Sequence, residues 1–281
     1  MLNFPLFVYL FAATTITLLF IRNPLVWPVS MVLTLVVAYF EHRINANGIA
    51  FVVVMLALCI AVRLDRYGNT TKNILKCLIG LFGLMLALHL VFGFNNLVLL
   101  KNQQISANGS LFTQYINLDK GIAGLLMVAS FCQPMSMPNT VVLKDKKTWL
   151  IALFTISITL ILAIITGVTR FQPQWTNYTV TFLVVNLFFT CIAEEAFFRG
   201  GIQQGISKLL PKYPIAAVAV SAITFGLSHI GGGVKIVFLA TVAGLGYSLI
   251  YQHTKRINAS IATHFAFNAV HFLLFVYPSI A

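Results

Sequence analysis

Charged residues are scarce in this sequence, and acidic residues are the scarcest of them. Only 9% of the residues are charged, whereas soluble proteins average about 25%. Hydrophobic residues make up 59% of the chain, and many of them lie in apolar runs of spanning length. The composition excludes an ordinary soluble domain. It predicts an all-α, polytopic membrane protein with about eight to ten transmembrane helices.

Cysteine is rare as well, and its placement excludes a disulfide scaffold. The chain contains Cys59, Cys77, Cys132 and Cys191, all within or beside apolar segments. They form no CxxC pair and no framework of the kind found in small secreted domains. We therefore interpret them as small side chains buried among apolar residues.

Basic residues outnumber acidic ones and give the chain a net charge of +12. They occur singly or in small groups between apolar runs, which is typical of cytoplasmic loops. We therefore expect the lipid bilayer, and no nucleic acid, as a partner. The groups that fall in every second connection predict one cytoplasmic side, with both termini on the other; they are Arg63/Arg66/Lys72, Lys144/Lys146/Lys147, Lys208/Lys212 and Lys255/Arg256.

About ten apolar segments are candidate spans. They cover residues 3–21, 24–40, 49–64, 74–94, 121–137, 148–168, 179–206, 214–230, 235–252 and 257–276. The segment Met135–Lys147, with a proline and a lysine cluster, is the best boundary among them. It predicts an N-terminal transmembrane region of unknown role (1–147) and a C-terminal helix bundle (148–281). The connection from Asn95 to Lys120 is the longest polar loop, and the sequence assigns it no function.

Two adjacent glutamates lie in the C-terminal bundle. Glu194 and Glu195 follow the apolar run Phe182–Ala193, and Arg199 comes four residues after Glu195. An ionised carboxylate in hydrocarbon is costly, so residues of this kind are usually inward-facing and functional. α-Helical spacing predicts that Glu195 lies within pairing distance of Arg199. Glu194, rotated by about 100°, then faces something else.

Two histidines and an asparagine lie in later apolar segments. His229 ends one segment and precedes three glycines, while His264 and Asn268 share a helix face at i and i+4. If residues 179–206 and 214–230 form a hairpin, Glu194 and His229 lie at about the same distance from its turn. His264 lies at the same depth only if the tip of this hairpin, Gln203 to Tyr213, projects into the cytoplasm, and in that case the four polar side chains can meet inside the bundle.

Such a group suits the hydrolysis of an acyl bond. A carboxylate can act as a general base toward water, and an amide can stabilise an oxyanion. Ser228 adjoins His229, but adjacent residues on a helix do not face each other, which disfavours a serine nucleophile. Zinc held by Glu194, His229 and His264 is a chemical alternative, although no HExxH motif supports it.

At these residues the chain resembles the CPBP family of intramembrane proteases. That family includes the CAAX prenyl endopeptidases and bacteriocin-processing or self-immunity proteins. Its pattern is EExxxR, then FxxxH, then HxxxN or HxxxD, and it matches Glu194–Arg199, Phe225–His229 and His264–Asn268 in that order. The resemblance covers about residues 148–276.

The resemblance implies a glutamate protease in which Glu194, with His229, activates the attacking water. It also implies that His264 and Asn268 form the oxyanion site. The residues implied to support these groups are Glu195 and Arg199.

The resemblance further implies that the enzyme needs no cofactor, with a zinc-dependent version of the same protease as the alternative. The implied substrate is a membrane-associated peptide or a lipidated protein. The implied location is a bacterial plasma membrane, with the active site opening toward the cytoplasm. Two hypotheses from other classes remain: a transporter, since intramembrane acids paired with histidines occur in ion pathways, and a non-catalytic immunity or binding protein.

Overall fold

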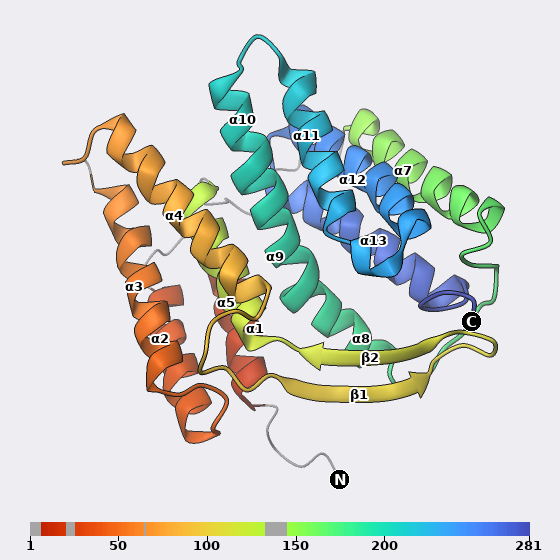
Figure 1. Ribbon diagram of the computed structural model, residues 1–281, viewed down its shortest axis with the longest axis horizontal. Helices are drawn as coiled ribbons and strands as arrows, with labels where there is room; N and C mark the ends of the chain where they lie inside the picture. The colour runs from red at the N-terminus through yellow and green to blue at the C-terminus, as the bar shows by residue number, and fades with distance from the viewer. Residues whose placement is uncertain (1–6, 21–25, 65, 133–144) are drawn as a thin grey trace. The chain divides into compact units, whose positions relative to one another are not determined.

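The computed structural model describes residues 7–20, 26–64, 66–132 and 145–281 (Figure 1). Each predicted span corresponds to a helix or a run of helical segments within these ranges. The N-terminal helices are α1 (Phe7–Leu19), α2 (Val26–Phe40), α3 (Ala46–Arg63), α4 (Asn69–Ala87) and α5 (Leu118–Phe131). The C-terminal helices include α7 (Lys146–Ile165), α11 (Pro214–Leu227), η3 (Ile230–Gly232), α12 (Val234–Thr254) and α13 (Ile257–Leu274).

The helix that carries the glutamates alternates between two geometries. It consists of α8 (Thr179–Val185), η1 (Asn186–Cys191), α9 (Ile192–Glu195), η2 (Ala196–Gln203) and α10 (Gln204–Leu209). The two η segments are π-helical. A π-helical segment widens the turn by one residue, and such segments are frequent at functional sites.

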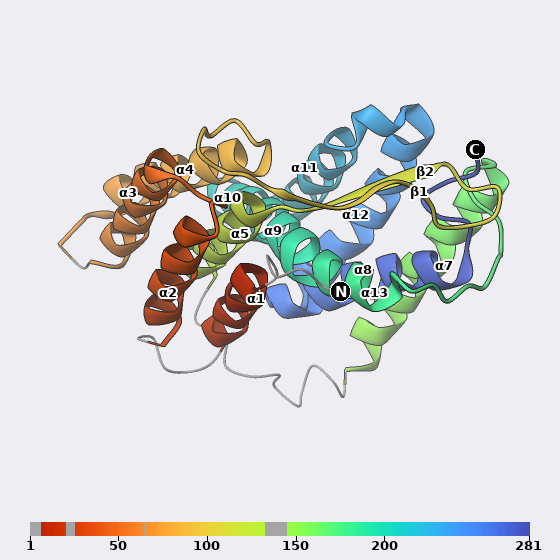
Figure 2. The ribbon, with the colours of Figure 1, turned by 90° about the horizontal axis from the view of Figure 1, so that it is seen from below.

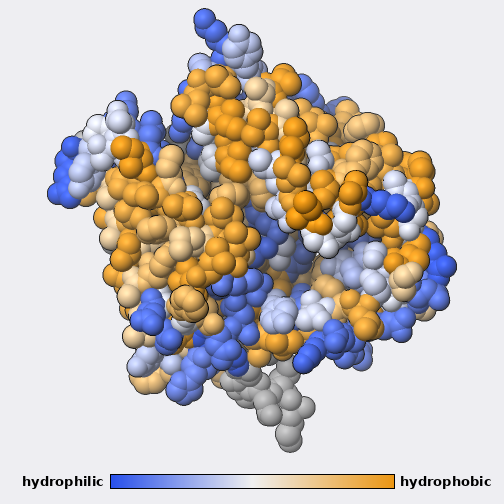
Figure 3. Space-filling model, viewed as in Figure 1, coloured by the Kyte–Doolittle hydropathy of each residue, from blue (hydrophilic) through white to orange (hydrophobic). Residues whose placement is uncertain are grey.

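The protein is an integral membrane protein, as its helices show. Among the described residues, five helices are long and apolar enough to cross a bilayer: Ala46–Arg63, Asn69–Ala87, Lys146–Ile165, Thr179–Leu209 and Val234–Thr254. α1, α2 and α11 are apolar but shorter. In α7 the large side chains of Leu150 and Phe154 are exposed, whereas Thr155 and Thr159 are buried. This pattern is the reverse of a soluble helix, and apolar residues cover much of the face seen in Figure 3.

The long polar connection contains a two-stranded sheet, which the sequence analysis did not predict. β1 (Leu97–Gln104) and β2 (Leu111–Ile116) are paired, and their arrows run in opposite directions in Figure 1. Leu100 and Ile105 pack with Phe182 and Phe272 in one buried cluster. The hairpin therefore has an apolar anchor, although the second half of β1 is polar and exposed.

The chain forms two compact units that interleave along the sequence. The first unit comprises Met1–Val98, Tyr115–Met137 and Phe188–Phe197, and the second comprises Leu99–Gln114, Pro138–Leu187 and Phe198–Ala281. Most of the predicted boundary at Met135–Lys147 lies outside the described residues. The functional division at residue 147 stays a prediction.

Hydroxyl groups join two helices of the first unit. Thr15 of α1 lies 2.7 Å from the Ser30 hydroxyl and 3.0 Å from that of Thr34, both on α2. Hydrogen bonds of this kind hold helices together where lipid offers no hydrophobic driving force. α5 packs against α1, α3 and α4 in the same unit (Figure 1).

α12 lies at the centre of the second unit. It packs against α7, α11 and α13, as Figure 2 also shows. Asp145, which precedes α7, lies 2.6 Å from Nε2 of His253 in the last turn of α12. Hydrogen bonds from the Thr148 hydroxyl and from His253 lower the pKa of Asp145 to about 2, so this carboxylate is ionised at neutral pH.

Candidate functional site

Glu194 and Glu195 lie on the short α-helical turn between the two π-helical segments. The sequence analysis assumed α-helical spacing between Glu195 and Arg199, whereas residues 196–203 are π-helical in the structure. Glu195 is fully buried, with 0% of its surface exposed. Glu195 and Arg199 belong to different units, and their pairing stays a prediction.

Lys120 of α5 forms an ion pair with Glu194 inside the first unit. Its Nζ donates to Oε1 of Glu194 at 2.7 Å, and the two side chains are only 19% and 16% exposed. This lysine was not predicted as a site residue, because in the sequence it ends a polar loop. The only sequence signal is a basic residue directly before an apolar span, and such residues are common at membrane surfaces.

Arg199 is fully buried in the second unit. Its guanidinium donates to the backbone oxygen of Gly244 at 2.9 Å. It also lies 4.8 Å from the ring centroid of Phe225 and 5.3 Å from that of Tyr247. These rings stabilise the cation through their π-faces. Arg199 therefore connects η2, on which it lies, with α11 and α12.

The ring of Phe225 contacts the rings of both His229 and His264. Its ring centroid lies 4.8 Å from that of His229 and 5.5 Å from that of His264. Tyr247 stacks on His264, with ring centroids 4.7 Å apart and planes inclined by 17°. Tyr247 was not predicted as a site residue, since one tyrosine in an apolar helix carries no motif signal.

The hydrogen bonds of His229 indicate its tautomer. Nδ1 lies 2.8 Å from the backbone oxygen of Phe225, which can only accept, so Nδ1 carries the proton. The neutral ring then has its acceptor at Nε2.

Ser228 faces His229, contrary to expectation. Its hydroxyl lies 3.1 Å from Nδ1 of His229, because α11 ends at Leu227 and the two residues lie in a turn. However, the hydroxyl also donates to the oxygen of Phe225 at 2.7 Å. His229 donates to that same oxygen, so its Nδ1 cannot accept a proton from the serine. This arrangement disfavours a serine nucleophile, as the sequence analysis concluded on other grounds.

Asn268 of α13 contacts a second asparagine that the sequence analysis missed. Its Nδ2 donates to Oδ1 of Asn186 at 3.1 Å, and Asn186 is buried at the start of η1. Asn186 could have been found from the sequence, because it is a polar residue in the apolar run before the glutamates and polar residues in a membrane span are usually functional. Asn186 fixes the orientation of the Asn268 amide.

For the peptide hydrolysis that the sequence predicts, we expect Asn186→Leu to lower the turnover number about fivefold, because losing one hydrogen bond costs about 1 kcal/mol and loosens the orientation of the Asn268 amide. KM should change less than kcat. Initial-rate kinetics of the purified protein measure both quantities. Asn177→Leu, in the exposed turn before α8, is the matched control and should behave like the wild type. Equal kinetics for both variants would contradict this role for Asn186.

The described residues contain no group of three His, Cys, Asp or Glu side chains that could hold a metal ion. The zinc ligands of the alternative hypothesis, Glu194, His229 and His264, are divided between the two units. The meeting of Glu194 with the histidines therefore also stays a prediction.

One comparison with known proteins identifies the region that carries these residues. A family model described as type II CAAX prenyl endopeptidase Rce1-like matches residues 175–270. No curated protein and no solved structure matches the chain. The matched region contains all three sequence motifs, from Glu194 to Asn268. Residues 175–270 are therefore similar to the Rce1-like type II CAAX prenyl endopeptidases, which agrees with the protease family that the motifs resemble.

Proposed function

We propose that the protein is a glutamate-dependent intramembrane endopeptidase that hydrolyses a peptide bond in a membrane-associated peptide or lipidated protein. The observation that carries this proposal is the family match over residues 175–270, which includes every residue of the three motifs. The buried surroundings of Arg199 and His264 support it, because they are built from contacts among motif residues.

In the proposed reaction, Glu194 takes a proton from water, and the resulting hydroxide attacks the scissile carbonyl carbon. The carbonyl electrons move to its oxygen, and His264 and Asn268 stabilise the charge that develops there. The C–N bond then breaks, and the leaving nitrogen receives the proton from Glu194. Glu194 is thereby regenerated as a carboxylate.

The histidines have distinct roles in this proposal. His229 has its acceptor at Nε2, which suits a residue that orients water by accepting a hydrogen bond. His264 is only 4% exposed and stacked on Tyr247, so its ring is fixed in direction. A fixed donor costs no reorganisation during the reaction.

Removal of metal ions is expected to leave the activity unchanged, since the proposed mechanism uses only protein groups. Cleavage by the purified protein is measured before and after dialysis against a strong chelator. Loss of activity that zinc restores would favour the zinc-dependent alternative with Glu194, His229 and His264 as ligands. Calcium or magnesium added in place of zinc controls for general ionic effects.

The substrate is tested in two steps. A fluorescent peptide with a prenylated CAAX tail is incubated with the protein in lipid nanodiscs, beside the same peptide without the lipid. Mass spectrometry of membrane peptides from cells with the wild type or with Glu194→Gln then identifies native products. Products present only with the wild type support a protease, and identical peptide sets would contradict it.

A further inference from the structure

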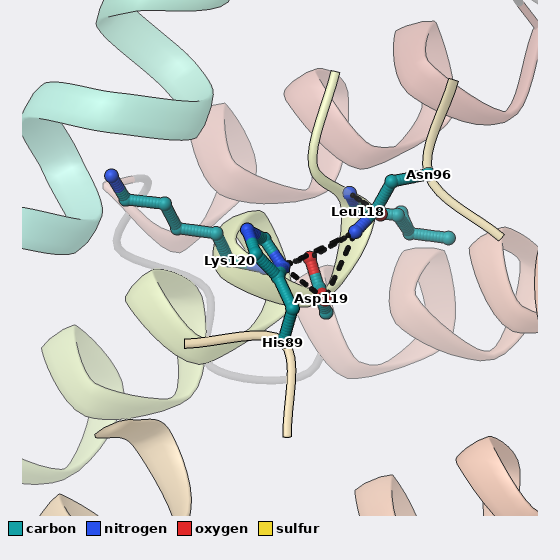
Figure 4. Close-up of polar contacts among 5 residues, drawn as sticks. All are labelled: His89, Asn96, Leu118, Asp119 and Lys120. Atoms are coloured by element: carbon teal, nitrogen blue, oxygen red, sulfur yellow. Dashed lines mark hydrogen bonds and ion pairs between the residues drawn. The ribbon is translucent and has the colours of Figure 1, made fainter. Parts of the chain in front are cut away.

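The first turn of α5 is fixed by polar contacts within the first unit (Figure 4). Asp119 is only 1% exposed, and its carboxylate lies 2.7 Å from Nδ1 of His89. Asn96 donates to both of its oxygens, at 2.9 and 3.0 Å, and accepts from the backbone nitrogen of Leu118. The start of α5 therefore has a defined position.

The side chain of Lys120 takes no part in these contacts and points away from them. In Figure 4 its side chain extends away from the carboxylate of Asp119, while its backbone nitrogen donates to that carboxylate at 2.8 Å. Asp119 thus fixes the backbone of Lys120, and the ammonium group remains available for another partner. That partner is Glu194, at 2.7 Å.

Close helix packing brings α5 to the segment that carries Glu194. A Cβ atom placed on Gly124 would lie 2.8 Å from Cα of Ala193, and one on Gly121 would lie 2.7 Å from the ring of Phe189. The backbone of α5 can approach that of Ala193 only because position 124 is glycine, and the glycine at position 121 leaves room for the Phe189 ring. Lys120 and Gly124 are four residues apart on α5 and share a helix face. The packing that seats Gly124 against Ala193 therefore also directs Lys120 toward Glu194.

Forming this ion pair requires the desolvation of two charges, which is unfavourable unless the contacts around the pair compensate for it. Both side chains are mostly buried, and withdrawing two charges from water costs several kcal/mol per ion before their attraction compensates. Good geometry and further hydrogen bonds are needed to recover that cost. Here the glycine contacts and the fixed start of α5 supply the geometry.

We propose that Lys120 is a positioning residue that holds the carboxylate of Glu194 in one orientation for its reaction with water. The inference rests on the proposed function, because it assumes that Glu194 is the base. It gives α5 a part in catalysis, although the three sequence motifs lie outside the N-terminal region. A misplacement of about 1 Å in a catalytic group can cost about 100-fold in rate.

The test compares Lys120→Met, which removes the charge but keeps the chain length, with Lys120→Arg, which keeps the charge. We expect Lys120→Met to lower kcat at least tenfold with KM within about twofold, and Lys120→Arg to recover most of the loss. Cleavage of the prenylated CAAX peptide, or of a native product identified as above, provides the readout. Lys72→Met, at the start of α4 in the same unit, is the matched control.

Thermal unfolding in detergent supplies a second readout that needs no substrate. Lys120→Met and Glu194→Gln should be non-additive in the double variant, because each removes the same ion pair. Additive effects on unfolding, or wild-type kcat in Lys120→Met, would overturn the inference. An equal loss of kcat in Lys120→Arg and Lys120→Met would also overturn it. Full activity of Glu194→Gln would instead overturn the proposed function, which keeps the two failures distinct.

Discussion

Replacement of Glu194 by glutamine is expected to abolish peptide cleavage while the protein still inserts into the membrane. Glutamine has nearly the same shape but cannot accept a proton from water. Loss of a general base costs about 100- to 10,000-fold in rate. The initial rate of cleavage in nanodiscs measures the effect, and the yield of monodisperse protein after detergent extraction measures folding.

Glu41→Gln is the control for this experiment. It makes the same chemical change in the first unit, in the turn that follows α2. We expect it to retain activity, which would attribute the loss in Glu194→Gln to the position and not to the missing charge. Cleavage at the wild-type rate by Glu194→Gln would remove Glu194 from the mechanism.

Replacement of Arg199 by methionine is expected to reduce both stability and activity. The guanidinium is 0% exposed, donates to the oxygen of Gly244 and lies over the rings of Phe225 and Tyr247. A hydrogen bond to a charged group contributes about 1.5–3 kcal/mol, and a desolvated cation–π contact about 2 kcal/mol. We therefore expect a loss of about 3–5 kcal/mol in the free energy of unfolding, measured by chemical denaturation in mixed micelles.

The activity should fall as well, because Phe225 and Tyr247 both contact His264. Arg199→Lys should retain more stability and activity than Arg199→Met but less than the wild type, since an ammonium group lacks the planar shape that stacks on rings. Arg170→Met, at an exposed position in the same unit, is the control. Wild-type stability in Arg199→Met would show that the guanidinium contacts contribute little.

The sequence predicted the helices well because an apolar run in a membrane protein has few alternatives to a helix. It failed at β1, where four apolar residues are followed by Lys101 and three polar residues that resemble a loop. It also failed at the two π-helical segments. Periodicity along a sequence assumes 3.6 residues per turn, so a widened turn leaves no trace in the pattern of apolar residues.

The candidate site was predicted as far as its residues follow a motif. His229 and His264 both contact Phe225 in the structure, and their catalytic roles stay predictions. Lys120 and Asn186 were missed because their partners lie 74 and 82 residues away. Only the packing of helices brings such residues together, and a single sequence contains no direct record of that packing.

The ring of Phe225 explains what the first position of the FxxxH motif requires. Arg199, His229 and His264 all lie against this one ring, and a π-face and a ring edge attract such groups in ways that an aliphatic side chain of equal volume cannot. An aromatic ring at this position therefore contacts three polar side chains, in addition to filling space in the core. Tyrosine should be a closer substitute there than leucine, even though leucine is the more hydrophobic residue.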